Sequence, residues 1–306
     1  MTTIAEASLT RAADKPYAYP ARKKRIKPSS IAIIVFLSIC ALFFCVPLYV
    51  IVVTSLKTMD QIRQGDIFAL PWQLNFDAWV TAWDKSCSGT VCAGIKVGFL
   101  NSLEILFPSL FLSIALSSVT GYALALWNVR WANTYLFVLF MCAFVPFQII
   151  MVPLILITGF LHVYGTIWGI AVVHAVLAMP ILTLIFRNYY RGIPTEIMSA
   201  AIMDSGSFWK IFWEIILPMS GNIMIVVLIF QITSIWNDFL IGLTYGGIGT
   251  QPMTVILANV VITALGEANY NVDMASALLT AFPPLVIYFV LGRFFVQGIT
   301  AGALKG

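Results

Sequence analysis

The stretch SAAIMDSGSFWKIFWEIILP, Ser199 to Pro218, is apolar but carries three charged side chains and a break in its middle. Roughly nine residues before the break, from Pro194 to Met203, have helical composition. The DSGS sequence at 204–207 favours a turn, because Gly206 tolerates positive φ and Asp and Ser bond to nearby backbone groups. The apolar spacing over 208–216 then predicts a second short helix. We therefore predict a helix–turn–helix at a membrane surface; a loop that only rests on lipid headgroups is the alternative.

The rest of the chain is apolar enough to be solvated mainly by lipid. Its 306 residues are 60% hydrophobic and 10% charged, whereas an ordinary soluble domain is about 25% charged. Six apolar runs approach the roughly 20 residues needed to span a bilayer, so the predicted fold class is all-α, a polytopic membrane protein with six transmembrane helices. The first run exceeds the roughly 7–15 apolar residues of a signal peptide and is read as a retained span. The runs lie near 31–54, 99–127, 133–158, 164–186, 221–244 and 274–296.

The positions of Lys and Arg predict the orientation, since cytoplasmic segments carry an excess of both. Seven of them precede the first span, whereas the loop near 245–273 has none. Both termini are therefore expected in the cytoplasm, and the loop at 55–97 outside. The predicted organisation is a basic cytoplasmic tail at 1–30, a transmembrane domain at 31–297 with a cytoplasmic loop at 188–220, and a cytoplasmic tail at 298–306.

The five cysteines do not form a disulfide scaffold. Cys87 and Cys92 lie in the 55–97 loop, where an oxidising compartment would allow a small disulfide; two free thiols are the other reading. Cys40, Cys45 and Cys142 lie in predicted spans and are interpreted as small packing residues.

Motifs for catalysis are missing from the sequence. It has no phosphate-binding G-x-x-x-x-G-K-[ST], no H-E-x-x-H, no G-x-S-x-G and no Cys/His cluster. His162 and His174 stand alone and are interpreted as capping or packing residues. We therefore predict no catalytic residue and no metal site, and a membrane-anchored enzyme is poorly supported.

Polar groups inside spans are costly, so each suggests a function. Amides and carboxylates could hydrogen-bond the hydroxyl groups of a solute and an indole could stack on it, but a helix–helix hydrogen-bond network would use the same groups. A secondary transporter would need a relay of ionisable residues and an inverted repeat, and neither is evident. The candidate pathway residues are Asn101, Glu104, Gln148, Trp236, Asn237 and Asp238.

The opening stretch resembles the cytoplasmic EAA loop of ABC-importer permeases, whose pattern is Glu-Ala-Ala, three residues, Gly, nine residues, Ile-x-Leu-Pro. Ala200 and Ala201 match its start, and Ile215, Leu217 and Pro218 match its end. Two positions depart from the pattern: Ser199 replaces Glu, and Ser205 replaces Gly, with Gly206 one place later.

The resemblance extends over most of the chain from about residue 31, and it is closest to the carbohydrate branch, in particular to glucose/mannose-type permeases. It implies the fold of a type I importer and residence in the bacterial inner membrane. The stretches that carry it are FRNYYRGIP at 186–194, IILPMS at 215–220, IWNDFL at 235–240, QPMTV at 251–255, NVDMASA at 271–277 and GITAGALKG at 298–306.

The resemblance also implies partners: a second homologous permease, two ATPase subunits that bind ATP and Mg, and an external sugar-binding protein. This chain would bind no cofactor or nucleic acid itself, and it would couple to the ATPases through the loop at 194–218. An importer for another small solute, such as a polyol or a sulfonated sugar, is the alternative. The expected coupling residues are Ser199, Ala200, Ala201, Asp204, Ser205, Gly206, Ile215, Leu217 and Pro218.

Overall fold

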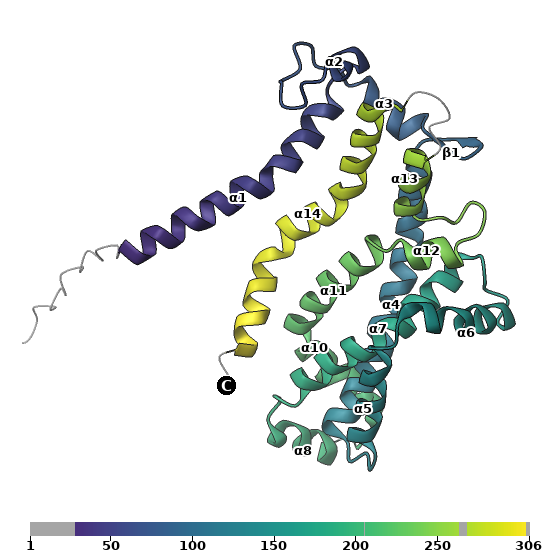
Figure 1. Ribbon diagram of the computed structural model, residues 1–306. Helices are drawn as coiled ribbons and strands as arrows, with labels where there is room; N and C mark the ends of the chain where they lie inside the picture. The colour runs from purple at the N-terminus through teal and green to yellow at the C-terminus, as the bar shows by residue number, and fades with distance from the viewer. Residues whose placement is uncertain (1–27, 205, 263–267, 304–306) are drawn as a thin grey trace, which may run out of the picture. The chain divides into compact units, whose positions relative to one another are not determined.

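The computed structural model describes residues 28–204, 206–262 and 268–303 (Figure 1). Ser205 and most of the predicted N-terminal tail lie outside the described residues. The chain separates into two compact units, Met1–Tyr49 and Val50–Gly306. The described part of the first unit belongs to α1 (Pro28–Ser55), an apolar helix that is long enough to span a membrane.

The second unit is almost entirely helical, as the sequence predicts. Its one described sheet is an antiparallel hairpin in which Cys87 lies opposite Cys92 and Ser88 opposite Val91. The elements are α2 (Met59–Arg63), α3 (Asp77–Asp84), β1 (Cys87–Ser88), β2 (Val91–Cys92), α4 (Lys96–Leu126), α5 (Ala132–Cys142), α6 (Phe147–Phe160), α7 (Ile167–Tyr190), α8 (Thr195–Asp204), α9 (Phe208–Ile211), the π-helical turn η1 (Phe212–Ile216), α10 (Leu217–Met219), α11 (Gly221–Trp236), α12 (Leu240–Tyr245), α13 (Met253–Ile262) and α14 (Tyr270–Ala303).

Among the described residues, four helices can each cross a membrane alone: Ser29–Ser55, Lys96–Leu126, Ile167–Tyr190 and Tyr270–Gly292. The third predicted span, 133–158, is instead two helices, α5 and α6, bent by 104°. The break coincides with Pro146, which lacks an amide hydrogen and disfavours a helical residue before it. If each bent pair counts as one span, the described chain holds up to six.

The fifth predicted span, 221–244, is two helices in the structure, α11 and the short α12. Helix α11 ends at Trp236. The Asp238 carboxylate then accepts hydrogen bonds from the backbone N–H groups of Ile241 and Gly242, in the first turn of α12. Before this span, α10 continues through Pro218, and the helix axis turns by 79° at Ser220.

Helices α4 and α7 form the main packed pair of the second unit (Figure 1). Gly121 allows their close approach, because a Cβ atom at this position would lie 2.7 Å from the Cβ of Phe186. Ser109, Ser113 and Ser117 lie four residues apart on the same helix and are fully buried. Small residues at these positions let the helix backbones approach.

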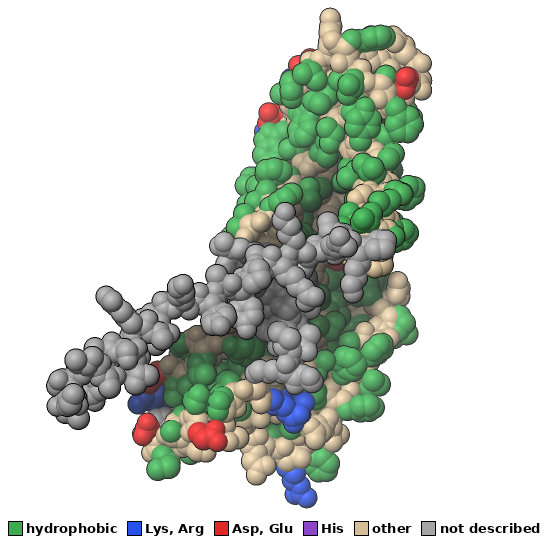
Figure 2. All heavy atoms as spheres, turned by 90° about the vertical axis from the view of Figure 1, so that its left-hand side faces the viewer, with side chains coloured by type: hydrophobic (Ala, Val, Ile, Leu, Met, Phe, Trp, Pro, Cys, Tyr) green, Lys and Arg blue, Asp and Glu red, His purple; other side chains and the backbone are tan. Residues whose placement is uncertain are grey.

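Two large apolar clusters hold the second unit together. One lies around Trp236, Tyr245 and Met253, and the other around Tyr122, Phe186 and Phe212. Outside these clusters, hydrophobic side chains remain exposed, and Figure 2 shows a face on which they predominate over charged ones. This distribution suits a protein whose solvent is lipid.

Candidate functional site

The predicted helix–turn–helix is present over 195–219. Helix α8 covers the predicted first helix, and Gly206 then adopts φ of 62°, in the left-handed region that favours glycine. Ser207 begins the second helix as its N-cap, and its hydroxyl accepts a hydrogen bond from the N–H of Lys210 at 3.5 Å. The sequence prediction of two short helices about a DSGS turn is confirmed for the described residues. We call residues 195–219 the helix–turn–helix segment.

The inner face of this segment packs on the ends of α4 and α7. Met198, Phe212 and Ile216 are buried in the cluster that contains Phe186. Ala201 is also buried, with 4% of its surface exposed, whereas Ala200 is exposed. Two of the expected coupling residues, Ala200 and Ala201, thus lie on different sides of α8.

Hydrogen bonds and a ring contact attach the segment to the two helices at its turn and at its exit. The Tyr122 hydroxyl of α4 donates to the carbonyl of Phe208 at 3.3 Å, and their ring centroids are 4.7 Å apart. The Tyr189 hydroxyl of α7 donates to the carbonyl of Met219 at 2.7 Å. Because the segment is held at its turn and at its exit, a force on it would be passed to α4 and α7.

The segment exposes large apolar side chains as well as charged ones. Met203, Trp209 and Trp213 are exposed by 87%, 56% and 60%. Several large apolar side chains exposed on one short segment are typical of a protein or membrane contact. Sequence reasoning missed these three residues, although Met203 follows Ala200 at helical spacing and so shares its face.

The expected coupling residues thus divide by burial. Ile215 and Leu217 are half-buried, Ala201 is buried, and Ser205 lies outside the described residues. The exposed members are Ser199, Ala200, Asp204, Gly206 and Pro218.

A polar region lies near the N-terminal end of α4, where this helix meets residues 249–254. The Asn101 amide donates to the carbonyls of Gly249 at 2.8 Å and Gln251 at 2.9 Å. The neighbouring Ser102 hydroxyl accepts from the N–H of Met253 at 2.8 Å. Asn101, predicted as a pathway residue, therefore holds a loop in place.

Two more predicted pathway residues have structural partners in the same region. The buried Trp236 indole N–H donates to the carbonyl of Thr280 on α14 at 3.0 Å. The carbonyl of Asp238 accepts from the hydroxyl of Thr254, and its carboxylate lies 3.9 Å from Nε2 of the buried His174. Asn101 and Asp238 thus both hold the 249–254 stretch through hydrogen bonds between different helices and loops.

The remaining predicted pathway residues are Glu104, Gln148 and Asn237, whose side chains are exposed. No group of three or more His, Cys, Asp or Glu side chains that could hold a metal occurs within the described residues.

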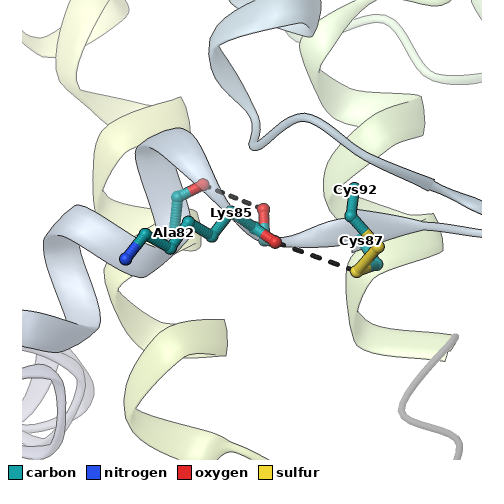
Figure 3. Close-up of a disulfide and its surroundings, with 5 residues drawn as sticks. Ala82, Lys85, Cys87 and Cys92 are labelled. Carbon is teal, nitrogen blue, oxygen red and sulfur yellow. Dashed lines mark hydrogen bonds between the residues drawn. A yellow bond between two sulfur atoms is a disulfide. The ribbon is translucent and has the colours of Figure 1, made fainter.

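A disulfide-bonded hairpin lies beside this region. Cys87 and Cys92 are bonded, and Figure 3 shows the pair beyond the last turn of α3, with Lys85 and Ala82. Gly94 closes the hairpin at φ of 71°, and its N–H donates to the carbonyl of Ser86 at 2.9 Å. A side chain at Gly94 would overlap the backbone of Trp83, so only glycine fits there. We call the hairpin at 86–94 together with the 249–254 stretch the hairpin end.

Three curated relatives resemble this chain in sequence. A probable ABC transporter permease protein of Pyrococcus horikoshii is 43% identical over 164 residues, which cover 53% of this chain and 59% of the relative. An osmoprotective compounds uptake permease protein of Synechocystis is 32% identical, covering 79% of this chain and 83% of the relative. An alpha-glucoside transport system permease protein of Rhizobium meliloti is 34% identical, covering 70% of this chain and 58% of the relative. The chain thus spans less than two thirds of the first and third of these proteins.

The fold has a solved counterpart. A bacterial ABC transporter involved in the import of the acidic polysaccharide alginate superposes with a TM-score of 0.75, covering 92% of this chain and all of that one, at 20% identity. Residues 103–300 match the family described as binding-protein-dependent transport system inner membrane component. This match covers the helix–turn–helix segment and most of the spanning helices. The chain therefore belongs to the family of binding-protein-dependent inner membrane components, the permeases of ABC importers.

Proposed function

We propose that this chain is the permease subunit of an ATP-driven sugar importer. The relatives that support a sugar include the alpha-glucoside permease and a xylose/arabinose import permease protein of Haloferax volcanii. Two further relatives are named as permease proteins of transport systems for arabinooligosaccharides and for starch degradation products. The chain would form the translocation pathway together with a second, homologous permease.

The observation that carries the coupling role is the division of the helix–turn–helix segment into an attached inner face and an outer face that exposes large apolar side chains. Ala200, Met203 and Trp209 present the outer face, which we propose docks on an ATPase subunit. ATP-driven closure of two such subunits would move the segment, and the contacts of Tyr122 and Tyr189 would transmit that movement to α4 and α7. The helix groups would then move as rigid bodies, so that the translocation pathway opens alternately to the two sides of the membrane.

We further propose that the helix–turn–helix segment is cytoplasmic and the hairpin end is external. The Lys and Arg distribution supports this orientation, with both termini inside, and so does the Cys87–Cys92 disulfide, since such bonds persist in oxidising compartments. An external binding protein would deliver the solute at the hairpin end. ATP and Mg would be bound by the ATPase subunits and not by this chain.

One relative favours a second candidate cargo. The Synechocystis permease is described as taking up osmoprotective compounds, so a polyol or another small neutral solute is the alternative to a nutrient sugar.

Deletion of the gene in its host, followed by uptake of labelled sugars and polyols, tests the proposal. We expect uptake of one sugar to be lost, to return with the wild-type gene, and not to return with the Ala200→Asp variant. Loss of polyol uptake alone would favour the alternative cargo. Normal uptake of every sugar and polyol in the deletion strain would contradict the proposal.

The orientation has its own test, in which a cysteine replaces Ile248 or Met203. Both positions are highly exposed, so a membrane-impermeant thiol reagent should label residue 248 in intact cells and residue 203 only in inverted vesicles. The opposite labelling pattern would overturn the orientation.

A further inference from the structure

A cavity of about 420 Å³ lies at the hairpin end. It is bounded by the disulfide hairpin, the start of α4, the loop that Asn101 holds, and α13. Its volume falls in the range of roughly 300–1,000 Å³ that is usual for small-molecule sites. The lining residues are Ser88, Gly89, Thr90, Val91, Ala93, Gly94, Val97, Asn101, Ile248, Gly249, Gln251, Ile256 and Asn259.

The walls of this cavity are held by a disulfide and by hydrogen bonds on both sides. The Cys87–Cys92 bond closes the hairpin, and the Gly94 N–H ties its far strand to Ser86. Ile95, the next residue, is fully buried, and its N–H donates to the carbonyl of Ala82 at 3.0 Å. The opposite wall is held by the two hydrogen bonds of the Asn101 amide. A ligand would therefore meet a preformed site, which lowers the entropic cost of binding.

The polar groups in the cavity are amides and hydroxyls in defined orientations. Both hydrogen bonds of Asn101 come from its nitrogen, so its side-chain oxygen is set as an acceptor. The Gln251 side-chain oxygen accepts from the amide of Asn259 at 3.4 Å, so the Gln251 nitrogen is set as a donor. Val97 and Ile256 supply apolar surface beside them. An acceptor, a donor and an apolar wall together match the hydroxyl groups and the C–H face of a sugar ring.

The charges around the cavity favour a neutral ligand. Its lining contains no Asp, Glu, Lys or Arg. Lys96 and Asp84 lie next to the hairpin, but they pair with each other at 2.7 Å. An ionic ligand would have no partner for its charge, whereas a neutral hydroxylated one would need none.

We propose that this cavity is a saccharide-binding subsite at the external mouth of the permease, which receives a neutral sugar unit before it enters the pathway. The proposal rests on the proposed import function and adds a location and a ligand class to it. The subsite is built from the hairpin, α4, the loop at 248–251 and α13, and of the candidate pathway residues only Asn101 lines it.

The experiment uses the complete transporter in lipid nanodiscs without the binding protein, with Cys40, Cys45 and Cys142 replaced by serine. Ile248→Cys places a thiol at the cavity, because Ile248 lines it and is fully exposed. Val80→Cys is the matched control, since Val80 is exposed on α3 outside the lining. The rate of maleimide labelling is measured against increasing concentrations of maltose and of the sugar whose uptake the deletion strain loses.

We expect the transported sugar to slow labelling at residue 248 saturably and several-fold, and to leave labelling at residue 80 unchanged. Gln251→Leu should abolish the protection while the melting temperature of the transporter is kept, because the backbone carbonyl of residue 251 still bonds to Asn101. Matched substitution of the exposed Gln64 by leucine should keep the protection.

Two outcomes would overturn the proposal. Labelling at residue 248 that is insensitive to the transported sugar would remove the subsite while leaving the import function intact. Protection that appears only when the binding protein is added would make the cavity a protein-docking surface instead. Failure of the import function itself is recognised separately, because uptake in the deletion strain would then be normal for every sugar.

Discussion

The two ends of the packed pair α4 and α7 are built differently. The helix–turn–helix segment is attached mainly by burial of apolar and aromatic side chains, such as Phe212 and Ile216 against Phe186. The hairpin end is held by a disulfide, a glycine with positive φ and the hydrogen bonds of one buried amide. An apolar interface suits a segment that must move together with its helices, because packed side chains transmit displacement. Hydrogen bonds and a cross-link suit an end that shapes a polar cavity.

The largest expected effect is that of a charge on the inner face of the helix–turn–helix segment. Ala201→Asp would place an unpaired carboxylate among Met198, Phe186 and Phe212, at a cost of about 3–5 kcal/mol. We expect most of the folded permease to be lost, as measured by its amount in detergent-solubilised membranes and its melting temperature. A normal melting temperature would show that α8 does not pack through this side.

The second effect concerns the outer face one residue away. Ala200→Asp should leave the amount and melting temperature unchanged, because Ala200 is exposed. Burying that carboxylate against an ATPase would cost several kcal/mol, and 1.4 kcal/mol corresponds to tenfold. We therefore expect uptake to fall by about tenfold or more, with less ATPase retained on the purified permease. Ala200→Ser is the conservative control, and full uptake with Ala200→Asp would remove the docking role.

At the hairpin end, removal of the disulfide should have a moderate effect. The bond closes a short loop, for which the chain-entropy relation gives about 2 kcal/mol. We expect the double variant Cys87→Ser/Cys92→Ser to melt at a lower temperature and to weaken sugar protection of residue 248. Cys142→Ser, which removes an exposed and unpaired thiol, should change neither. An unchanged melting temperature in the double variant would mean that packing against α13 alone holds the hairpin.

The smallest expected effect is that of the cap at Asp238. Asp238→Ala removes the acceptor for the N–H groups of Ile241 and Gly242, and loss of such a cap costs about 1 kcal/mol. Asp238→Ser keeps a capping oxygen and should recover most of the melting temperature. If uptake falls in both variants while melting temperature is kept in the serine variant, Asp238 contacts the solute and its role is more than structural.

The sequence allowed the helix–turn–helix segment to be predicted almost to the residue, because its signals are local. Gly206 acts on the backbone next to it, and the structure has the positive φ at Gly206 and the second helix beginning at Phe208, where the sequence predicts the turn and the helix. The apolar composition that marks a membrane span is also a local signal, but the position of a break within a span is not. Pro146 breaks the third span into two helices, whereas Pro218 lies inside a helix that turns only at Ser220. The outcome depends on neighbouring helices, which can satisfy the backbone groups that proline frees.

By itself, the sequence determined that this protein is helical and lies in a membrane, and it determined where the helix–turn–helix segment falls, since hydropathy and turn chemistry are read residue by residue. Only the tertiary structure decided that Ala200 faces outward while Ala201 is buried, and that Asn101 and Asp238 hold the 249–254 stretch. Both decisions depend on partners far away in the chain, such as Gly249 for Asn101. No local pattern carries such contacts, because they exist only once α4, α7 and α13 have packed.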